Sequence, residues 1–276
     1  MSRSRVLDES DRGLVDRLLG ADPILNCFVA SRVEAGALDP SGVGEIWGYP
    51  SHAPRALLHV GANIVPVNAD AEALDAFAAD IGRWRSFVAI VAPVEAAFGL
   101  WDRLAETWPH AYGNARVIRE RQLLMSCPGP TVVDADPRLC PARPEDFESY
   151  FAGAVHMYRE ELEEDPLLTN PTGYRRYVRS LVDGGRAFAI LDGGRVVFKA
   201  DLGAVSTRVA QVQGVWVAPD LRGRGLSVPA MAGVTDRILA GGRTASLYVN
   251  DFNAPAIACY RRVGYDVVGE LATILF

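Results

Sequence analysis

Hydrophobic and polar positions recur with helical and strand periods along the second half of the chain. Apolar side chains at spacings of three and four predict an amphipathic helix over residues 144–164, and a second helix is predicted over 172–182. Strands are predicted at 187–191, 196–202, 209–217, 245–249 and 267–276, with further helices at 228–240 and 254–263. Strands connected by helices in this way are typical of an α/β sheet of mixed direction.

The first half shows a related order of elements. Its pattern predicts, in chain order, a strand at 57–67, a helix at 71–82, a strand at 86–91, a helix at 94–108 and a strand at 116–125. The interval from Arg85 to Trp101 equals the interval from Thr244 to Tyr260, at 16 residues. This agreement favours a duplication in which two domains share one fold.

A cluster of residues that break helices and strands separates the two halves. Cys127-Pro-Gly-Pro is followed by Asp134-Ala-Asp-Pro and by Pro141-Ala-Arg-Pro. Proline lacks a backbone N–H and interrupts regular elements. We therefore expect a domain at residues 1–126, a linker at 127–136 and a second domain at 137–276.

Composition narrows the class of protein. The chain has 276 residues, of which 49% are hydrophobic and 22% charged, as in folded globular proteins. No stretch approaches the roughly 18 apolar residues of a membrane-spanning helix, and the first residues run into acidic positions, so we expect a cytoplasmic protein without a membrane partner. A net charge of −6 argues against nucleic-acid binding. The four cysteines lack metal-site or disulfide spacing, so no metal is expected.

A glycine-rich turn lies between the strand at 209–217 and the helix at 228–240. Its residues are Arg222-Gly-Arg-Gly-Leu-Ser227, and Pro229 requires the helix to begin near Gly225 or Leu226, because proline fits only the first turn. A helix N-terminus presents unpaired N–H groups to an anion, glycines allow close approach, and Arg222 and Arg224 add positive charge. The turn therefore predicts a phosphate site. It matches neither a Walker loop nor a Rossmann fingerprint.

At this point the sequence resembles the GNAT superfamily of N-acetyltransferases. The family signature is Gln or Arg, then Gly, then Gly or Ala after a strand, and Arg222, Gly225 and Ser227 occupy those positions. Ser227 departs from the usual residue but is small. A strand, an Asn-rich turn and a helix that carries Tyr260 and ends in Gly-Tyr follow at residues 247–265. The resemblance is firm over residues 190–276.

This resemblance implies tandem GNAT-like domains of the α/β (α+β) class, each a mixed, mostly antiparallel sheet flanked by helices. It implies a catalytic, acyl-CoA-binding second domain. The first domain is then a degenerate copy, because the glycine turn is missing between Val67 and Ala71.

The resemblance also assigns roles to residues. The backbone of Val217 would contact the thioester and hold the developing oxyanion, and Tyr260 would be the general acid for the departing thiolate. The residues assigned to acetyl-CoA, the expected co-substrate, are Val215, Trp216, Val217, Arg222, Gly223, Arg224, Gly225, Leu226, Ser227, Asn250, Asn253 and Tyr260. Asn253 is equally suited to cap the following helix, and Trp216 to pack in the core.

No residue stands out as the general base that an amine acceptor requires. The candidates are Glu160, Glu163, Asp165 and Asp201, and each of them is explained more simply as a surface carboxylate. Gln213 cannot accept a proton. The expected activity is transfer of an acetyl or other acyl group from acyl-CoA to the primary amine of a small molecule or peptide. The alternatives are a non-catalytic acyl-CoA sensor and aminoacyl transfer from tRNA, which the acidic balance disfavours. The sequence does not determine the oligomeric state, and a homodimer is one option.

Overall fold

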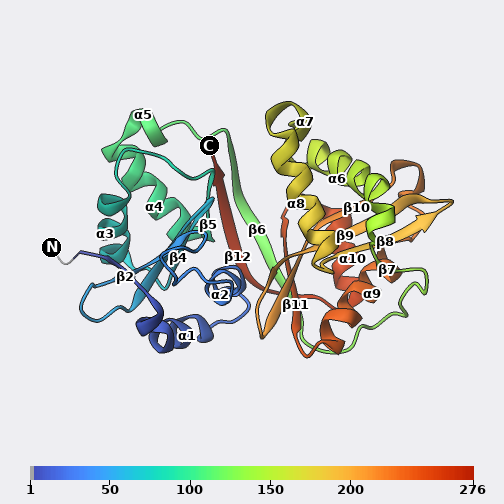
Figure 1. Ribbon diagram of the computed structural model, residues 1–276, viewed down its shortest axis with the longest axis horizontal. Coiled ribbons are helices and arrows are strands. Elements are labelled where there is room, and N and C mark those ends of the chain that lie inside the picture. Colours follow the sequence, from blue (N-terminus) through green and yellow to red (C-terminus); the bar gives the residue numbers. More distant parts are fainter. Residues whose placement is uncertain (1–2) are drawn as a thin grey trace. The chain divides into compact units, whose positions relative to one another are not determined.

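The computed structural model describes residues 3–276 and divides into two compact units, coloured along the chain in Figure 1. The first unit comprises the chain up to Leu124 together with Tyr248–Phe252 and Val267–Phe276. The second unit comprises Met125–Leu247 and Asn253–Asp266. The units are therefore interleaved in sequence.

The first unit contains these elements: β1 (Arg5–Val6), η1 (Glu9–Asp11), α1 (Arg12–Gly20), α2 (Cys27–Glu34), β2 (Glu45–Tyr49), β3 (Ala56–Val60), β4 (Asn63–Val67), α3 (Ala71–Ile81), β5 (Ala89–Pro93), α4 (Val94–Thr107), α5 (Pro109–Tyr112), most of β6 (Val117–Cys127) and β12 (Asp266–Leu275). Their strands follow the order β1-β2-β3-β4-β5-β12-β6. The pairs β1–β2, β2–β3, β3–β4 and β5–β12 are antiparallel, and β4 and β5 run parallel.

The C-terminal strand is the main departure from the expected domain boundaries. Residues 267–276 were assigned to the second domain, but β12 pairs with β5 from Leu271↔Pro93 to Leu275↔Ala89, inside the first unit. Ala272 and Ile274 are buried there in one core with Phe77 and Leu100. A buried strand face of this kind fixes the register and keeps the strand with the core that it completes.

The predicted elements of the first half are present, with one difference. The run expected as a single strand at 57–67 is the hairpin of β3 and β4, which pair from Leu57↔Val67 to Val60↔Ile64. Gly61 lies in the intervening turn, where a Cβ would come within 2.7 Å of the His59 ring. The turn between the two strands could not be predicted, because the apolar pattern continues through it.

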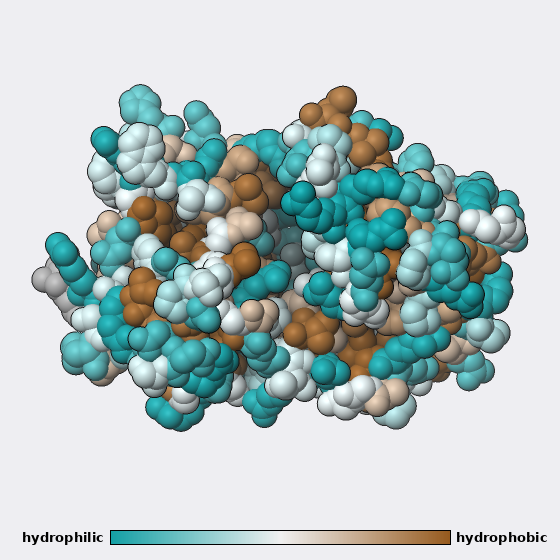
Figure 2. Space-filling view, in the orientation of Figure 1, coloured by the Kyte–Doolittle hydropathy of each residue, from teal (hydrophilic) through white to brown (hydrophobic). Residues whose placement is uncertain are grey.

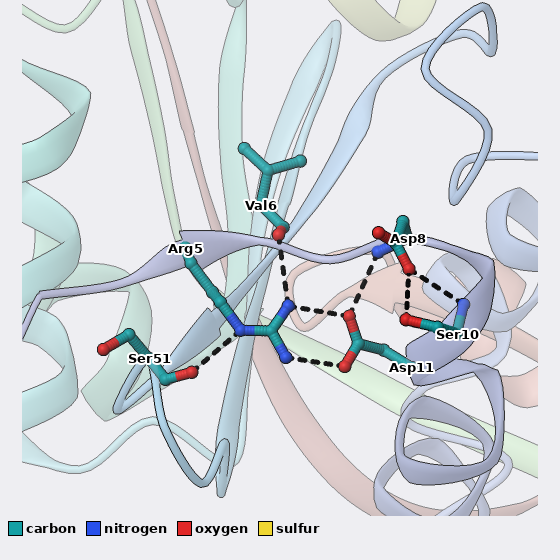
Figure 3. A network of polar contacts seen from close by, with 6 residues as sticks. All are labelled: Arg5, Val6, Asp8, Ser10, Asp11 and Ser51. Atoms are coloured by element: carbon teal, nitrogen blue, oxygen red, sulfur yellow. Dashed lines mark hydrogen bonds and ion pairs between the residues drawn. The ribbon is translucent and has the colours of Figure 1, made fainter.

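The beginning of the first unit is fastened by one arginine (Figure 3). Arg5 donates from both terminal nitrogens to the carboxylate of Asp11, at 2.7 and 2.6 Å, and from Nε to the carbonyl oxygen of Ser51 at 2.8 Å. Asp8 caps η1 by accepting from the backbone N–H of Ser10 at 2.8 Å. The bond to Ser51 holds β1 against the loop that follows β2, and the bonds to Asp11 hold β1 to η1.

The second unit contains β7 (Cys140–Pro141), η2 (Pro144–Asp146), α6 (Phe147–Leu162), α7 (Pro166–Thr169), α8 (Pro171–Asp183), β8 (Ala187–Asp192), β9 (Arg195–Val205), β10 (Val209–Val217), η3 (Pro219–Leu221), α9 (Ser227–Ala240), the first part of β11 (Thr244–Asn250) and α10 (Ala254–Val263). The strand order is β11-β10-β9-β8-β7. Only β10 and β11 run parallel.

Helices cover both faces of this second sheet. Ala187 and Ala189 of β8 face a core formed with α6 and α8, which includes Phe147 and Leu181. Phe188, which points to the opposite face, lies beneath Arg237 of α9 at 5.9 Å. Each fully buried large apolar side chain contributes about 1.5–3 kcal/mol to such a core.

The expected linker is part of the second unit. Residues 128–139 form neither helix nor strand. They are nevertheless held to α9, because Thr131 Oγ1 donates to Asp236 at 2.9 Å and the N–H of Asp136 donates to the carbonyl oxygen of Pro229 at 2.9 Å. On the face shown in Figure 2, hydrophobic residues appear in separate groups, one of them over α7, where Leu167 and Leu168 are exposed.

Candidate functional site

Strand β10 is irregular where the candidate site begins. Its pairing with β9 shifts register between Gln213 and Trp216, and Gly214 in that interval has φ +59°. Its parallel pairing with β11 covers only Val209–Val212. Within the second unit, the edge of β10 beyond Val212 is therefore not part of that ladder.

Val217 presents its backbone polar groups on this edge. The N–H of Ala218 donates to the carbonyl oxygen of Val197 in β9 at 2.9 Å. Successive residues of a strand direct their N–H and C=O groups to opposite sides, so those of Val217 point away from β9. The carbonyl oxygen of Val217 does accept from a residue outside β9, namely Arg222 Nε at 3.0 Å.

The glycine turn that follows is open to an incoming group. Gly223 and Gly225 have φ +72° and +81°, in the left-handed region that favours glycine, and a Cβ added at either would meet no atom within 4 Å. Helix α9 then begins at Ser227, after Leu226, and no side chain caps it. The first turn of α9 thus offers backbone N–H groups and the positive end of the helix dipole beside the turn.

The two arginines of the turn have different surroundings. Arg222 is engaged with the protein, since its Nη2 donates to Glu160 Oε2 of α6 at 2.6 Å in addition to the bond to Val217. Arg224 is exposed. Arg222 therefore fixes the turn to β10 and α6, and Arg224 is the arginine available to attract an anion.

Tyr260 lies buried in α10. Asn253 caps this helix by accepting from the N–H of Ala256 at 3.2 Å, and Gly264 ends it with φ +118°. Burial, and then the nearby thiol of Cys259 and carboxylate of Glu161, raise the pKa of Tyr260 well above the ordinary value of 10. The phenol is therefore protonated at neutral pH and can donate its hydrogen to an anion.

The start of α9 and α10 belong to the second unit. Burial raises the pKa of the thiol of Cys259, the residue before Tyr260, and Ser227 at the start of α9 opposes that rise. The turn at 222–227 and Tyr260 belong to the same unit.

The two asparagines lie in different units. Asn253 serves as the helix cap, one of the two roles expected for it. Asn250 belongs to the first unit, where its Oδ1 accepts from Gln122 Nε2 at 3.0 Å. Asn250 and the glycine turn belong to different units. Trp216 is buried, with its Nε1 unpaired among residues 3–276, and stacks on His156 at 6.0 Å.

The candidate bases are mostly engaged. Glu160 pairs with Arg222, and Asp165 pairs with Arg159 at 2.6 Å. Glu163 is exposed at the end of α6.

Asp201 is buried, so the expectation of a surface carboxylate is wrong for this residue. It is only 4% exposed and binds Lys199 at 2.7 Å. The signal for this pair was present in Val196-Val-Phe-Lys-Ala-Asp-Leu, because residues two apart share one face of a strand.

Neither a metal-binding cluster nor a membrane-spanning helix is found within residues 3–276. No cluster of three or more His, Cys, Asp or Glu side chains there is arranged to hold a metal ion. None of the helices in that range has the length and apolar character needed to cross a membrane.

Comparison with known families supports two domains. Residues 145–265 match the model of the GNAT acetyltransferase family, and residues 44–150 match DUF4081, a domain of unknown function. No curated protein sequence matches the chain.

Solved structures resemble the chain along its whole length. A Drosophila protein aligns with a TM-score of 0.66 and 15% identity, covering 100% of this chain and 99% of its own. A GNAT-family acetyltransferase from Colwellia psychrerythraea aligns with a TM-score of 0.60, 10% identity and 99% coverage of both chains. A tandem GNAT protein from the clavulanic acid biosynthesis pathway aligns with a TM-score of 0.57 and 12% identity, covering 99% and 98%. These likenesses confirm the expected fold class and the additional N-terminal domain.

Proposed function

Because residues 145–265 form a domain of the GNAT acetyltransferase family, we propose that the protein transfers an acyl group from acyl-CoA to a primary amine. We further propose acetyl-CoA as the donor, a small molecule or peptide as the acceptor, and the cytoplasm as the compartment. The observation that carries the proposal is the uncapped start of α9 beside two glycines with positive φ. This arrangement suits the pyrophosphate of CoA.

The residues of the turn fit a phosphate ligand. Space is open at Gly223 and Gly225, so backbone N–H groups of residues 223–227 are accessible to phosphate oxygens. Arg224 adds an exposed positive charge. Arg222 contributes by holding the turn in place through Val217 and Glu160.

Acyl transfer then requires two groups that the second unit supplies. The amine nitrogen attacks the thioester carbon, forming a C–N bond, and the carbonyl oxygen gains negative charge that the N–H of Val217 can stabilise. The C–S bond breaks as the carbonyl re-forms, the phenol of Tyr260 can donate its hydrogen to the departing thiolate, and the phenolate then regains a proton from solvent. The proton lost by the amine goes to solvent, since three candidate carboxylates are in ion pairs.

Those ion pairs also favour a second candidate function. A domain in which three of the four candidate bases are held in ion pairs suits an acyl-CoA-binding module that does not turn over. The two functions differ in the role of Tyr260, because a binding module needs its ring and not its hydroxyl.

The test uses the purified full-length chain with acetyl-CoA and a panel of primary amines, following release of free thiol. We expect thiol release that depends on the amine, and Tyr260→Phe to lower kcat about 100-fold while the Kd for CoA changes less than about threefold. Binding of CoA without amine-dependent thiol release for any amine would establish the binding module instead. Failure to bind CoA would refute both.

A further inference from the structure

Lys199, the single lysine of the chain, lies inside the second unit. Its side chain is 0% exposed, and that of its partner Asp201 is 6% exposed. Lys199 Nζ donates to Asp201 Oδ2 at 2.7 Å. Burying two charges is costly unless each has further partners, so the remaining bonds of this pair decide what it does.

Asp201 has a second donor. The hydroxyl of Tyr150 in α6 donates to Asp201 Oδ1. Burial, followed by the charge of Asp201, raises the pKa of Tyr150 well above its ordinary value, so this phenol stays a donor. Both carboxylate oxygens of Asp201 are thereby bonded, one from β9 and one from α6.

Lys199 has a second acceptor, which lies in β10. Its Nζ donates to the carbonyl oxygen of Gly214 at 2.8 Å. Gly214 is the residue with φ +59° in the register shift between Gln213 and Trp216. A carbonyl at a bulge lies outside the regular ladder, and a buried carbonyl left unpaired costs about 1–3 kcal/mol. The ammonium group satisfies it.

The bulge and the ion pair are fitted to each other. A Cβ at Gly214 would lie 2.6 Å from Asp201 Oδ2 and 3.0 Å from Lys199 Nζ. The charged pair therefore occupies the space that a side chain at residue 214 would need. Val217, whose N–H points to the open edge of β10, follows three residues later.

We propose that Lys199 and Asp201 are positioning residues for acyl transfer: they hold the bulge at Gly214 and so set the direction of the Val217 N–H. The inference rests on the proposed function, since it assigns these residues to the same reaction. Neither residue touches the turn at 222–227. Their loss should therefore lower the rate of transfer and leave the affinity for CoA nearly unchanged.

The decisive variant replaces the pair by apolar residues of similar size, Lys199→Met with Asp201→Leu. Apolar replacement of a buried ion pair is often tolerated, but it leaves the Gly214 carbonyl without its donor. We expect kcat to fall at least tenfold and the Kd for CoA to change less than threefold. Lys199→Arg, which keeps a charge and a donor, should recover part of kcat.

The matched control is Leu181→Ala in the core of α8, which removes buried apolar volume in the same unit. It should lower the melting temperature without changing kcat at a temperature where the variant is folded. If the pair served stability alone, the folded double variant would keep the wild-type kcat, and the proposal would be wrong. If the double variant does not fold, Lys199→Met with Asp201→Asn, which also removes the donor to the Gly214 carbonyl, carries the same comparison.

Hydrogen exchange gives a readout that does not depend on turnover. In the double variant, backbone amides of residues 213–217 should exchange at least tenfold faster than in the wild type, with those of α9 unchanged. Unchanged exchange at 213–217 would overturn the positioning role even if the wild type is active. The wild type could also fail to turn over while residues 213–217 exchange faster in the double variant than in the wild type. That result would support the clamp on the bulge and separately refute the acyl-transfer reaction.

Discussion

Arg222 donates from Nε to the carbonyl oxygen of Val217 across 3.0 Å, so one side chain joins the glycine turn to the end of β10. The same guanidinium reaches Glu160 in α6. The residue that opens the phosphate turn is thus oriented inward, toward the protein. The arginine of the sequence motif therefore holds the glycine turn of the proposed CoA site to β10 and α6.

Replacing Arg222 tests this fastening. Arg222→Met removes two charge-assisted bonds in a half-exposed setting, and we expect the Kd for CoA to rise about tenfold. Arg222→Lys should recover only part of the affinity, because an ammonium cannot reproduce the planar guanidinium fork. Isothermal titration calorimetry measures both, with Arg138→Met, which breaks the ion pair with Asp136, as the charge-matched control. An unchanged Kd for CoA in Arg222→Met would contradict the proposal that Arg222 holds the turn in place for CoA.

Gly225 allows a second comparison at matched backbone geometry. Gly225 and Gly194 both have φ +81°, and a Cβ at either meets no atom within 4 Å. Alanine at either position should therefore cost a similar stability, about 1–2 kcal/mol. Only Gly225→Ala places a methyl group where the phosphate is proposed to approach, so only it should raise the Kd for CoA, by at least tenfold. Equal affinities in the two variants would place the phosphate elsewhere.

The periodic elements of the second half could be predicted from sequence because each lies in a long, strongly patterned run. Helix 254–263 was expected at its observed bounds, since Asn253 and Gly264 mark both ends. The membership of β12 in the first unit could not be predicted. Local periodicity shows that 267–276 is a strand, but its partner β5 lies far away in sequence.

For the site, motif spacing brought the glycine turn and Tyr260 together, and the structure places both in one unit. It could not show that Arg222 points inward, because a side-chain direction depends on Val217 and Glu160 from other elements. A surface position was expected for Asp201, because a carboxylate considered alone gives no sign of a buried partner. The pairing with Lys199 on the same strand face would have indicated burial.

The stability of the fold should depend on alkaline pH through its buried tyrosines. Burial raises the pKa of Tyr260 in the folded chain, whereas the unfolded chain ionises near the ordinary value of 10. The folded state then holds more protons, so this stabilisation is complete below pH 10 and is lost as pH rises above it, by up to about 1.4 kcal/mol per pH unit.

Urea unfolding at pH 9 and pH 11 measures this effect. Tyr260→Phe removes one titrating group, so its midpoint should fall less between the two pH values than the wild-type midpoint does. Leu181→Ala, which destabilises without titrating, should shift the midpoint by a similar amount at both. An identical pH dependence in Tyr260→Phe and the wild type would mean that Tyr260 does not titrate with the unfolding transition.

The chain should bind one CoA, because the helix in the first unit that corresponds to α9 has a different start. Only residues 68–70 separate β4 from α3, with no glycine turn. Asp70 caps α3 by accepting from the N–H of Ala73 at 3.0 Å, and Glu72 lies in its first turn. A capped donor and two carboxylates disfavour a pyrophosphate at that position, whereas the start of α9 is uncapped. Calorimetric titration should give a stoichiometry of one CoA per chain. Gly225→Ala should weaken the affinity for this CoA, while Asp70→Asn should leave both stoichiometry and affinity as in the wild type. Two equivalents of bound CoA would refute this assignment.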